Sequence, residues 1–208
     1  MLSVMKFFPD NKAITTALRY MRVPPDKHNY ELILTVKNAF TKLQEFITPH
    51  FLWGRFHILH VDNGIQLEYT FIHSKDILRL TSRSDECILI AATLGHETDR
   101  QISIAQKKNM LEGLALDSCA SVMIDSCIDE YIQSEIVPSL RENERLTHRF
   151  SPGYGDLSMN VTEDIIAILD AAKRIGLSVT RSLMMSPIKS VTAVIGLYNK
   201  VFTENKTK

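Results

Sequence analysis

The sequence predicts an α+β fold, a single domain over residues 1–208 with a mainly antiparallel twisted β-sheet and flanking helices. Apolar runs with a period of two follow one another in the segment 56–93 and do not alternate strictly with helices. Helical apolar spacing occupies the segments before and after it. No internal repeat, low-complexity run or Gly/Ser linker divides the chain, and 208 residues with 45% hydrophobic content suffice for a substantial core.

The N-terminal part predicts two helices, over residues 11–21 and 26–47. Pro24-Pro25 separates them, because proline cannot continue a helix, and Pro49 closes the second one. The second helix begins near Asp26 and carries apolar residues at helical spacing. These residues are Tyr30, Ile33, Val36, Phe40, Leu43 and Ile47.

The period then changes to two, which predicts strands over residues 56–61 and 65–69 with Asp62-Asn63-Gly64 between them. Asn-Gly between two such runs is a strong signal for a β-hairpin. Two further strands are predicted at 76–80 and 87–93. Because the second of these is apolar on both faces, it is predicted to be a central strand.

A helical region follows over residues 98–136. It is too long for one globular helix without a break, and Lys107-Lys108-Asn109 is the predicted break. Small residues are frequent in the second half of the region, which lets this part pack closely against a sheet or another helix. They are Gly113, Ala115, Ser118, Cys119, Ala120 and Ser121.

The C-terminal part predicts one more helix and two strands. Asn160, with Glu163 three positions later, predicts a capping box that opens a helix to about Arg174. Gly176 lies just past the expected end of this helix, where glycine is favoured. The two strands flank a Ser186-Pro187 turn and are predicted over residues 177–180 and 191–197.

Charge, hydropathy and cysteine usage argue against several classes of protein. Twenty-four basic and 24 acidic side chains give zero net formal charge, so no nucleic-acid or membrane partner is predicted. No segment approaches the roughly 20 uninterrupted apolar residues of a membrane span. Residues 1–8 are too short an apolar run for a secretory leader. Together with three cysteines, an odd number without metal-site spacing, this predicts a cytoplasmic protein with reduced thiols.

No metal site is predicted, because the histidines lack chelating spacing. His57 and His60 are three positions apart in a predicted strand, so they point to opposite faces. No Walker loop, Rossmann fingerprint or Gly-x-Ser-x-Gly elbow occurs. Four acidic residues on the predicted helix are interpreted mainly as a solvated face, with an acid pair in a cleft as the alternative; they are Asp125, Asp129, Glu130 and Glu135.

Residues 149–156, Arg-Phe-Ser-Pro-Gly-Tyr-Gly-Asp, are the strongest candidate for a binding loop. Proline fixes the backbone, while Gly153 and Gly155 can take positive φ. Arg149 can fork a carboxylate or phosphate in two parallel hydrogen bonds, and Tyr154 can offer a ring face and a hydroxyl. An ordinary surface turn is the alternative on composition alone, since Ser, Pro, Gly and Asp are common turn residues.

In order and spacing, the segments 149–156 and 173–196 resemble the activation domain of cobalamin-dependent methionine synthase. The chain is similar in particular to the short, free-standing members of that family, in which the activation domain is a separate polypeptide. Two further segments fit the same group more loosely: Ala17-Leu-Arg-Tyr20 followed by a long helix, and the region from Leu94-Gly95 to Leu116-Asp117.

The resemblance implies an S-adenosylmethionine-binding activation subunit that supports reductive methylation of cob(II)alamin to methylcobalamin and has no catalytic residues of its own. It implies two partners, a methionine synthase polypeptide that carries the cobalamin and a flavodoxin-type electron donor. The alternative is a non-catalytic adaptor, or a reactivation factor for another corrinoid methyltransferase.

Position by position, the resemblance also implies roles for individual residues. Arg149 would bind the carboxylate of the ligand, and Ser151 would use its main chain. Tyr154, which follows Gly153, would place an aromatic face beside the sulfonium, a cation–π contact of roughly 0.5 to 2 kcal/mol. The family's acidic residue shortly before the arginine lies near Glu142, one position out of register.

Overall fold

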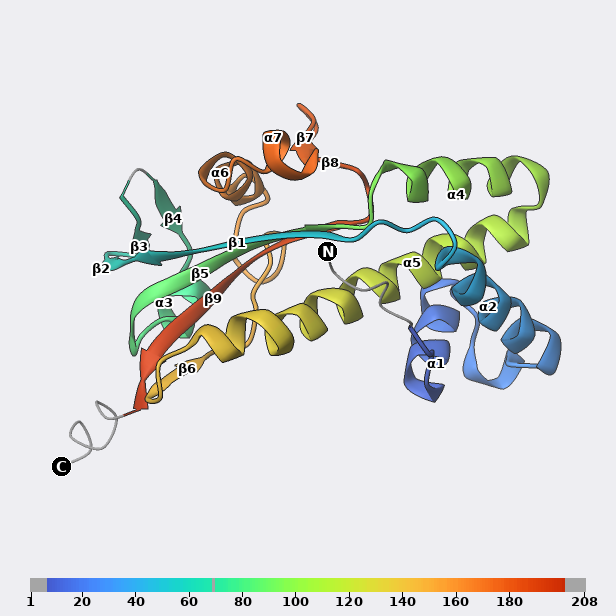
Figure 1. Cartoon of the computed structure of the whole chain (residues 1–208), viewed down its shortest axis with the longest axis horizontal. Helices are drawn as coiled ribbons and strands as arrows, with labels where there is room; N and C mark the ends of the chain where they lie inside the picture. The colour runs from blue at the N-terminus through green and yellow to red at the C-terminus, as the bar shows by residue number, and fades with distance from the viewer. Residues whose placement is uncertain (1–6, 69, 201–208) are drawn as a thin grey trace. The chain divides into compact units, whose positions relative to one another are not determined.

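The computed structural model describes residues 7–68 and 70–200 of the chain (Figure 1). These residues form two compact units. The first unit holds the described residues up to His50, together with Thr93–Cys127 and Pro187–Lys189. The second holds Phe51–Ala92, Ile128–Ser186 and the described residues from Ser190 onward. The predicted single domain stays a prediction, and most of the apolar run considered as a leader lies outside the described residues.

The first unit begins with two helices, as predicted. Helix α1 (Asn11–Tyr20) starts at Asp10, whose carboxylate accepts the Ala13 N–H at 2.7 Å. The second helix starts later than predicted. Pro25–Lys27 forms a separate 3-10 turn (η1), and α2 (Tyr30–Leu43) begins after Asn29, whose side chain accepts the Leu32 N–H at 2.9 Å.

Two long helices follow, α4 (His96–Lys108) and α5 (Met110–Tyr131), and the break between them lies at Asn109, as predicted. Asn109 leaves the helical conformation, with φ −149°, and its side-chain oxygen accepts the backbone N–H of Leu111 at 3.1 Å. The helices pack closely at Gly113, where an added Cβ would come within 2.5 Å of the Gln106 Cα. Gly113, one of the small residues of α5, thus allows close helix packing, as expected.

The second unit contains the main sheet, with strand order β1 (His50–His57), β5 (Ser84–Thr93), β9 (Ser190–Asn199) and β6 (Glu144–Leu146). The predicted mixed fold with a mainly antiparallel sheet is confirmed, and β5 is central. Figure 1 shows α6 (Val161–Ile168) and α7 (Ala171–Ile175) on one side of this sheet. Phe51 of β1 stacks on Tyr131 at the end of α5, with ring centroids 4.3 Å apart.

The predicted hairpin is present in a small antiparallel sheet of β2 (Leu59–Val61), β3 (Gly64–Gln66) and β4 (Phe71–His73). The turn between β2 and β3 consists of Asp62 and Asn63, and Asn63 has φ 64°, a left-handed conformation that asparagine tolerates. The strand predicted over 65–69 ends at Gln66 in the structure, and its last residue, Tyr69, lies outside the described residues.

The strand predicted over 76–80 is wrong, because these residues form helix α3 (Lys75–Leu80). Ser74 caps the helix, and its Oγ accepts the Ile77 N–H at 3.0 Å. A second cap comes from a remote residue: the Asp156 carboxylate accepts the Lys75 N–H at 2.8 Å. The first turn of a helix has backbone N–H groups without partners inside the helix, and the two caps accept hydrogen bonds from them. The caps therefore favour a helix over a strand.

The helix predicted over 160–174 is two helices in the structure, α6 and α7, because Asp170 between them has φ 52°. The predicted capping box is also wrong. Asn160 is itself helical, with φ −60° and ψ −28°, and makes no side-chain cap. Gly176 ends α7 with φ 67°, as predicted. The last predicted strands correspond to β7 (Ser178–Val179), which pairs with β8 (Met185–Ser186), and to β9.

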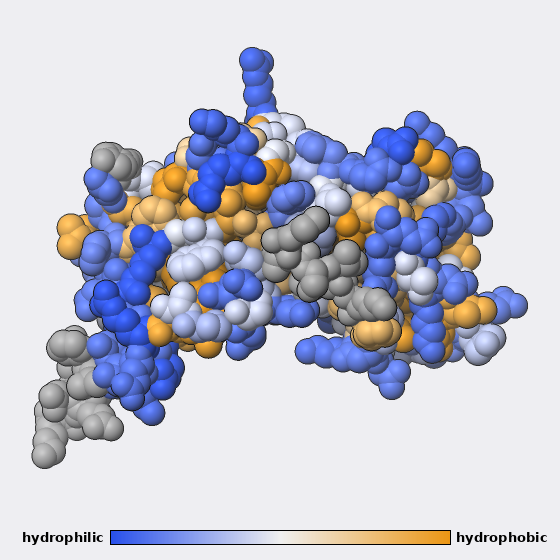
Figure 2. All heavy atoms as spheres, viewed as in Figure 1, coloured by the Kyte–Doolittle hydropathy of each residue, from blue (hydrophilic) through white to orange (hydrophobic). Residues whose placement is uncertain are grey.

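No helix in the described part of the chain combines the length and the apolar composition needed to cross a membrane. On the face drawn in Figure 2, hydrophobic residues form separate patches between hydrophilic ones. The apolar side chains of the second unit are largely in its core, which packs α6 against the sheet and includes Leu52, Cys87, Leu89, Val161, Ile165 and Val194.

Candidate functional site

The segment after β6 continues alongside β9 and thereby positions Arg149. The Thr147 N–H donates to the Gly196 carbonyl at 2.9 Å, and Phe150 exchanges two backbone hydrogen bonds with Val194, both at 2.9 Å. The backbone is thus extended here, and neighbouring side chains point to opposite sides. Because Phe150 packs against the core, Arg149 lies on the other side of the sheet.

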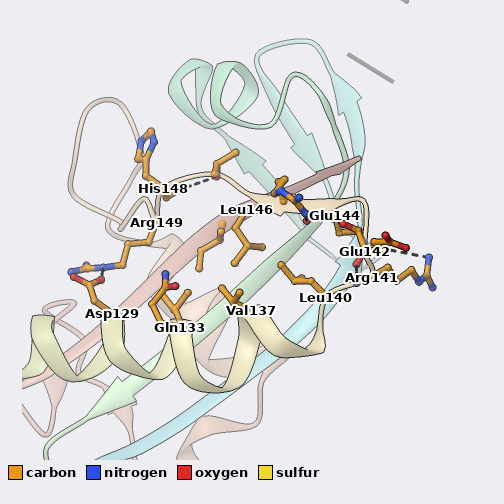
Figure 3. Close-up of a pocket in the computed structure, with 14 residues that line it drawn as sticks. Asp129, Gln133, Val137, Leu140, Arg141, Glu142, Glu144, Leu146, His148 and Arg149 are labelled. Atoms are coloured by element: carbon orange, nitrogen blue, oxygen red, sulfur yellow. Dashed lines mark hydrogen bonds and ion pairs between the residues drawn. The ribbon is translucent and has the colours of Figure 1, made fainter. Parts of the chain in front are cut away.

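On that side the structure contains a groove of about 810 Å³, whose lining residues all belong to the second unit (Figure 3). One wall comes from the end of α5, the π-helical turn η2 (Ile132–Ile136) and the 3-10 turn η3 (Val137–Ser139). The opposite wall is the segment 140–149, and Ile195 of β9 completes the lining. We call this cavity the α5–β6 groove.

One end of the α5–β6 groove carries an ion pair. The Arg149 Nε donates to the Asp129 Oδ1 at 2.8 Å. The Arg149 side chain is 24% exposed and that of Asp129 is 63% exposed, so water and solutes can reach the pair. The sequence interpretation placed Asp129 on a solvated helix face, and no local pattern indicates a partner 20 positions later.

The middle of the groove is apolar and its far end is charged again. Figure 3 shows Val137, Leu140 and Leu146 between the two ends. Glu142 and Glu144 lie at the far end, together with the exposed Arg141, which precedes Glu142 in the sequence. The cavity therefore offers an ion pair, an apolar stretch and carboxylates in succession.

The structure brings two of the predicted site residues to the same groove. Arg149 and Glu142 both line it, at opposite ends. Ser151, Gly153 and Tyr154 are not among its lining residues and form the turn that follows Arg149. The Ser151 carbonyl accepts the Tyr154 N–H at 3.3 Å, and the Tyr154 residue is 69% exposed.

The turn takes its shape from the two glycines, as predicted. Gly153 has φ 91° and Gly155 has φ 53°, values that residues with a Cβ rarely adopt. The Gly153 N–H donates to the Leu157 carbonyl at 2.8 Å. An added Cβ at Gly153 would also lie only 2.5 Å from the Met159 Sδ, so a side chain here would displace Met159 in addition to straining the backbone.

Asp156 anchors the end of the turn to α3, a role that the sequence did not indicate. Its Oδ1 accepts the Ser74 hydroxyl at 2.5 Å and the Asp76 N–H at 3.2 Å, and its Oδ2 accepts the Lys75 N–H. The Ser74 hydroxyl, with these backbone donors, lowers the pKa of the Asp156 carboxyl. The carboxylate is therefore held charged at the N-terminus of a helix, where it is favourable.

The described residues contain no set of three or more His, Cys, Asp or Glu that could hold a metal ion. Cys87, Cys119 and Cys127 are buried and are not joined in disulfides. Burial raises the pKa of the Cys87 and Cys119 thiols to about 12, so both stay protonated and unreactive.

Comparisons with known proteins give one informative result. No known protein family matches the sequence, and no curated protein matches it either. Among solved structures, the chain is similar to a crystal structure of the MetH reactivation domain bound to AdoHcy, with a TM-score of 0.64 over 88% of this chain and 75% of that one. The two sequences are 15% identical. The chain therefore has a fold like that of the MetH reactivation domain.

Proposed function

We propose that this chain is an S-adenosylmethionine-binding activation subunit for a cobalamin-dependent methionine synthase. It would support the reductive methylation of cob(II)alamin to methylcobalamin on a separate polypeptide that carries the cobalamin. Two observations support this function. The fold is that of a reactivation domain whose crystal structure holds AdoHcy, and the motif of residues 149–156 borders a groove of suitable size.

The arrangement of groups along the α5–β6 groove is the observation that carries the proposal. An amino-acid moiety bears a carboxylate and an ammonium group, which suit the guanidinium of Arg149 and the carboxylate of Asp129. The apolar stretch suits the thioether chain and one face of the adenine ring. Glu142 at the far end can accept hydrogen bonds from ribose hydroxyls, as carboxylates do in nucleotide sites.

The turn after Arg149 would add the remaining contacts. Ser151 is half-buried and Gly153 is exposed in the turn that follows Arg149, and Tyr154 is 69% exposed. We assign Tyr154 to the sulfonium, on the strength of its place in the motif and the affinity of aromatic faces for cations. A flavodoxin-type protein would supply the electron, as the resemblance of residues 149–156 and 173–196 to the activation domain implies.

Titration calorimetry with S-adenosylmethionine and S-adenosylhomocysteine tests the proposal. The wild-type chain should bind both. Arg149→Ala should weaken binding by about 1.5 to 3 kcal/mol, the range for a hydrogen bond to a charged group, or about 10- to 150-fold in Kd. The affinity of Arg149→Lys should lie between those of the wild type and Arg149→Ala, because lysine keeps the charge but cannot make two parallel hydrogen bonds.

The matched control is Arg100→Ala, which removes an exposed arginine paired with Glu97 on its own helix. This variant should bind both ligands as tightly as the wild type. Equal affinity of wild type and folded Arg149→Ala would remove Arg149 from the site. A wild-type chain that binds neither ligand would favour the adaptor function.

A further inference from the structure

One guanidinium and two carboxylates form a connected cluster across three strands of the second unit. Arg55 lies on β1, Glu86 on β5 and Glu144 on β6. The Arg55 Nε donates to the Glu86 Oε1 at 2.9 Å, while Nη1 and Nη2 donate to the two Glu144 oxygens at 3.1 and 2.7 Å. Nη2 also donates to the Glu86 Oε2. We call these three residues the Arg55 cluster.

The Arg55 cluster is largely withdrawn from water. The side chains of Arg55, Glu86 and Glu144 are 24%, 17% and 5% exposed. Removing charges from water is costly, and well-packed apolar side chains of similar volume often stabilise a fold as well or better. Two carboxylates also share a single guanidinium, which leaves an excess negative charge. The cluster is therefore better explained as a means of holding its side chains in one arrangement than as a means of stabilising the fold.

Glu144 connects the Arg55 cluster to the turn at the far end of the α5–β6 groove. Its Oε2 accepts the Arg141 N–H at 2.9 Å, and its own N–H donates to the Arg141 carbonyl, also at 2.9 Å. One residue thus closes the turn of residues 141–144 twice. Leu140, Arg141, Glu142 and Glu144 all line the groove, whereas Arg55 does not.

Arg141 and His57 also face the cluster, and neither can replace Arg55. The Arg141 Nη1 lies 3.7 Å from the Glu144 Oε1, and the His57 Nε2 lies 3.8 Å from the Glu86 Oε1. Their side chains are 81% and 90% exposed, so water screens both contacts. The hydrogen bonds from Arg55 are also the main reason that the pKa values of Glu86 and Glu144 are lowered.

We propose that Arg55 is a positioning residue for the α5–β6 groove. It holds the Glu144 carboxylate, and through Glu144 it orders the turn that carries Glu142. The identity of the ligand, S-adenosylmethionine, rests on the proposed function, but the ordering of the turn does not. Loss of Arg55 should therefore disturb the far end of the groove and leave the Arg149 end in place.

Arg55→Met tests this, because it removes the charge and the donors while keeping a long side chain. We expect the backbone amides of residues 141–144 to exchange hydrogen for deuterium at least about 10-fold faster than in the wild type. The Kd for S-adenosylmethionine should rise about 10- to 100-fold, as misplaced binding groups cause. Arg55→Lys should recover part of both effects. Arg149→Ala should lose affinity without faster exchange in this turn.

A double-variant cycle tests the route through the turn. Glu142→Gln alone should weaken binding. Combined with Arg55→Met it should add little further loss, because Arg55 acts by placing Glu142. If the losses of binding free energy in the two single variants add up in the double variant, the result would contradict this route. If Arg55→Met does not fold, Glu144→Gln serves in its place, since it keeps the shape of the side chain and removes the charge that Arg55 holds.

Wild-type exchange in residues 141–144 of a folded Arg55→Met chain, together with wild-type affinity, would overturn the proposal. The failure of the proposed function has a different signature, which is a wild-type chain that does not bind S-adenosylmethionine. In that case the hydrogen-exchange measurement still tests whether Arg55 orders the turn. Faster exchange in the turn supports the positioning role, and unchanged exchange rejects it.

Discussion

At the scale of single residues, Asp156 connects the candidate binding turn to a helix far away in the sequence. Its carboxylate accepts hydrogen bonds from the Ser74 hydroxyl and from the N–H groups of Lys75 and Asp76. These donors stabilise the charged form and lower the pKa of the carboxyl in the folded protein. The carboxylate therefore contributes stability above its unfolded pKa of about 3.9, and loses it as pH falls through the folded value.

We predict that Asp156→Asn lowers the melting temperature at pH 7 and that the difference from the wild type shrinks as the pH is lowered below about 4. The reason is that wild-type Asp156 becomes protonated there and loses the charge that the variant lacks at every pH. Thermal unfolding followed by circular dichroism from pH 3 to 7 measures this. Asp85→Asn, an exposed strand residue, is the control and should melt like the wild type.

A pH-independent difference between Asp156→Asn and the wild type would show that the charge of Asp156 is not what anchors the turn. The same variant should leave the affinity for ligand lower, because the turn that follows Arg149 loses its fixed end. Hydrogen exchange in residues 153–157 would report this loss of order directly.

Part of the candidate site could be predicted at this scale, because its signals are local. The run of residues 149–156 identifies Arg149 and the positive-φ glycines without any structure. The ion pair of Arg149 with Asp129 could not be predicted, since it joins a strand extension to a helix 20 positions earlier. Only the packing of α5 beside β6 brings the two side chains together.

At the scale of elements, local patterns predicted the elements whose signals lie within a few residues. The break at Asn109 and the hairpin at Asn63 are of this kind. The strand predicted over 76–80 failed for the opposite reason. Its helical conformation depends partly on a cap from Asp156, which lies 81 positions after Lys75 and is invisible to any local pattern.

The contact between α4 and α5 gives a prediction at this scale. In an exposed helix, Gly→Ala would stabilise by up to about 1 kcal/mol. At Gly113, however, the new Cβ would lie 2.5 Å from the Gln106 Cα and 2.6 Å from its backbone nitrogen. Overpacking against a backbone costs about 1 to 3 kcal/mol and outweighs the gain. We expect Gly113→Ala to lower the free energy of unfolding by about 1 to 2 kcal/mol.

Denaturant unfolding measures this difference, with Glu112→Ala as the control. Glu112 neighbours Gly113 and makes an exposed ion pair with Lys42, so its loss should change the free energy of unfolding by less than about 1 kcal/mol. A Gly113→Ala chain as stable as the wild type, or more stable, would mean that the two helices can separate without cost.

At the scale of the whole molecule, the class of fold follows from the sequence, because the period of the apolar residues persists over long segments. The order of elements follows only in part, since the strand predicted over 76–80 is helix α3. The division of the described residues into two compact units does not follow, since each unit is assembled from separate stretches of chain. No composition change or linker marks such a boundary. The proposed function involves a partner polypeptide, and it should be tested with both units together and not with one unit alone.

The proposed activation of a methionine synthase can be tested by reconstitution. The chain, mixed with a methionine synthase that lacks its own activation domain, an electron donor and S-adenosylmethionine, should restore methylcobalamin from the cob(II)alamin form, which absorbance spectra can follow. In the proposed function the chain would hold the methyl donor in place, an effect of proximity and orientation. Arg149→Ala should therefore be slow at low S-adenosylmethionine and recover as its concentration is raised, because the variant loses binding. Tyr154→Ala should also be much weaker than the wild type. Equal recovery without the chain, or undiminished rescue by a variant that does not bind the ligand, would favour an adaptor.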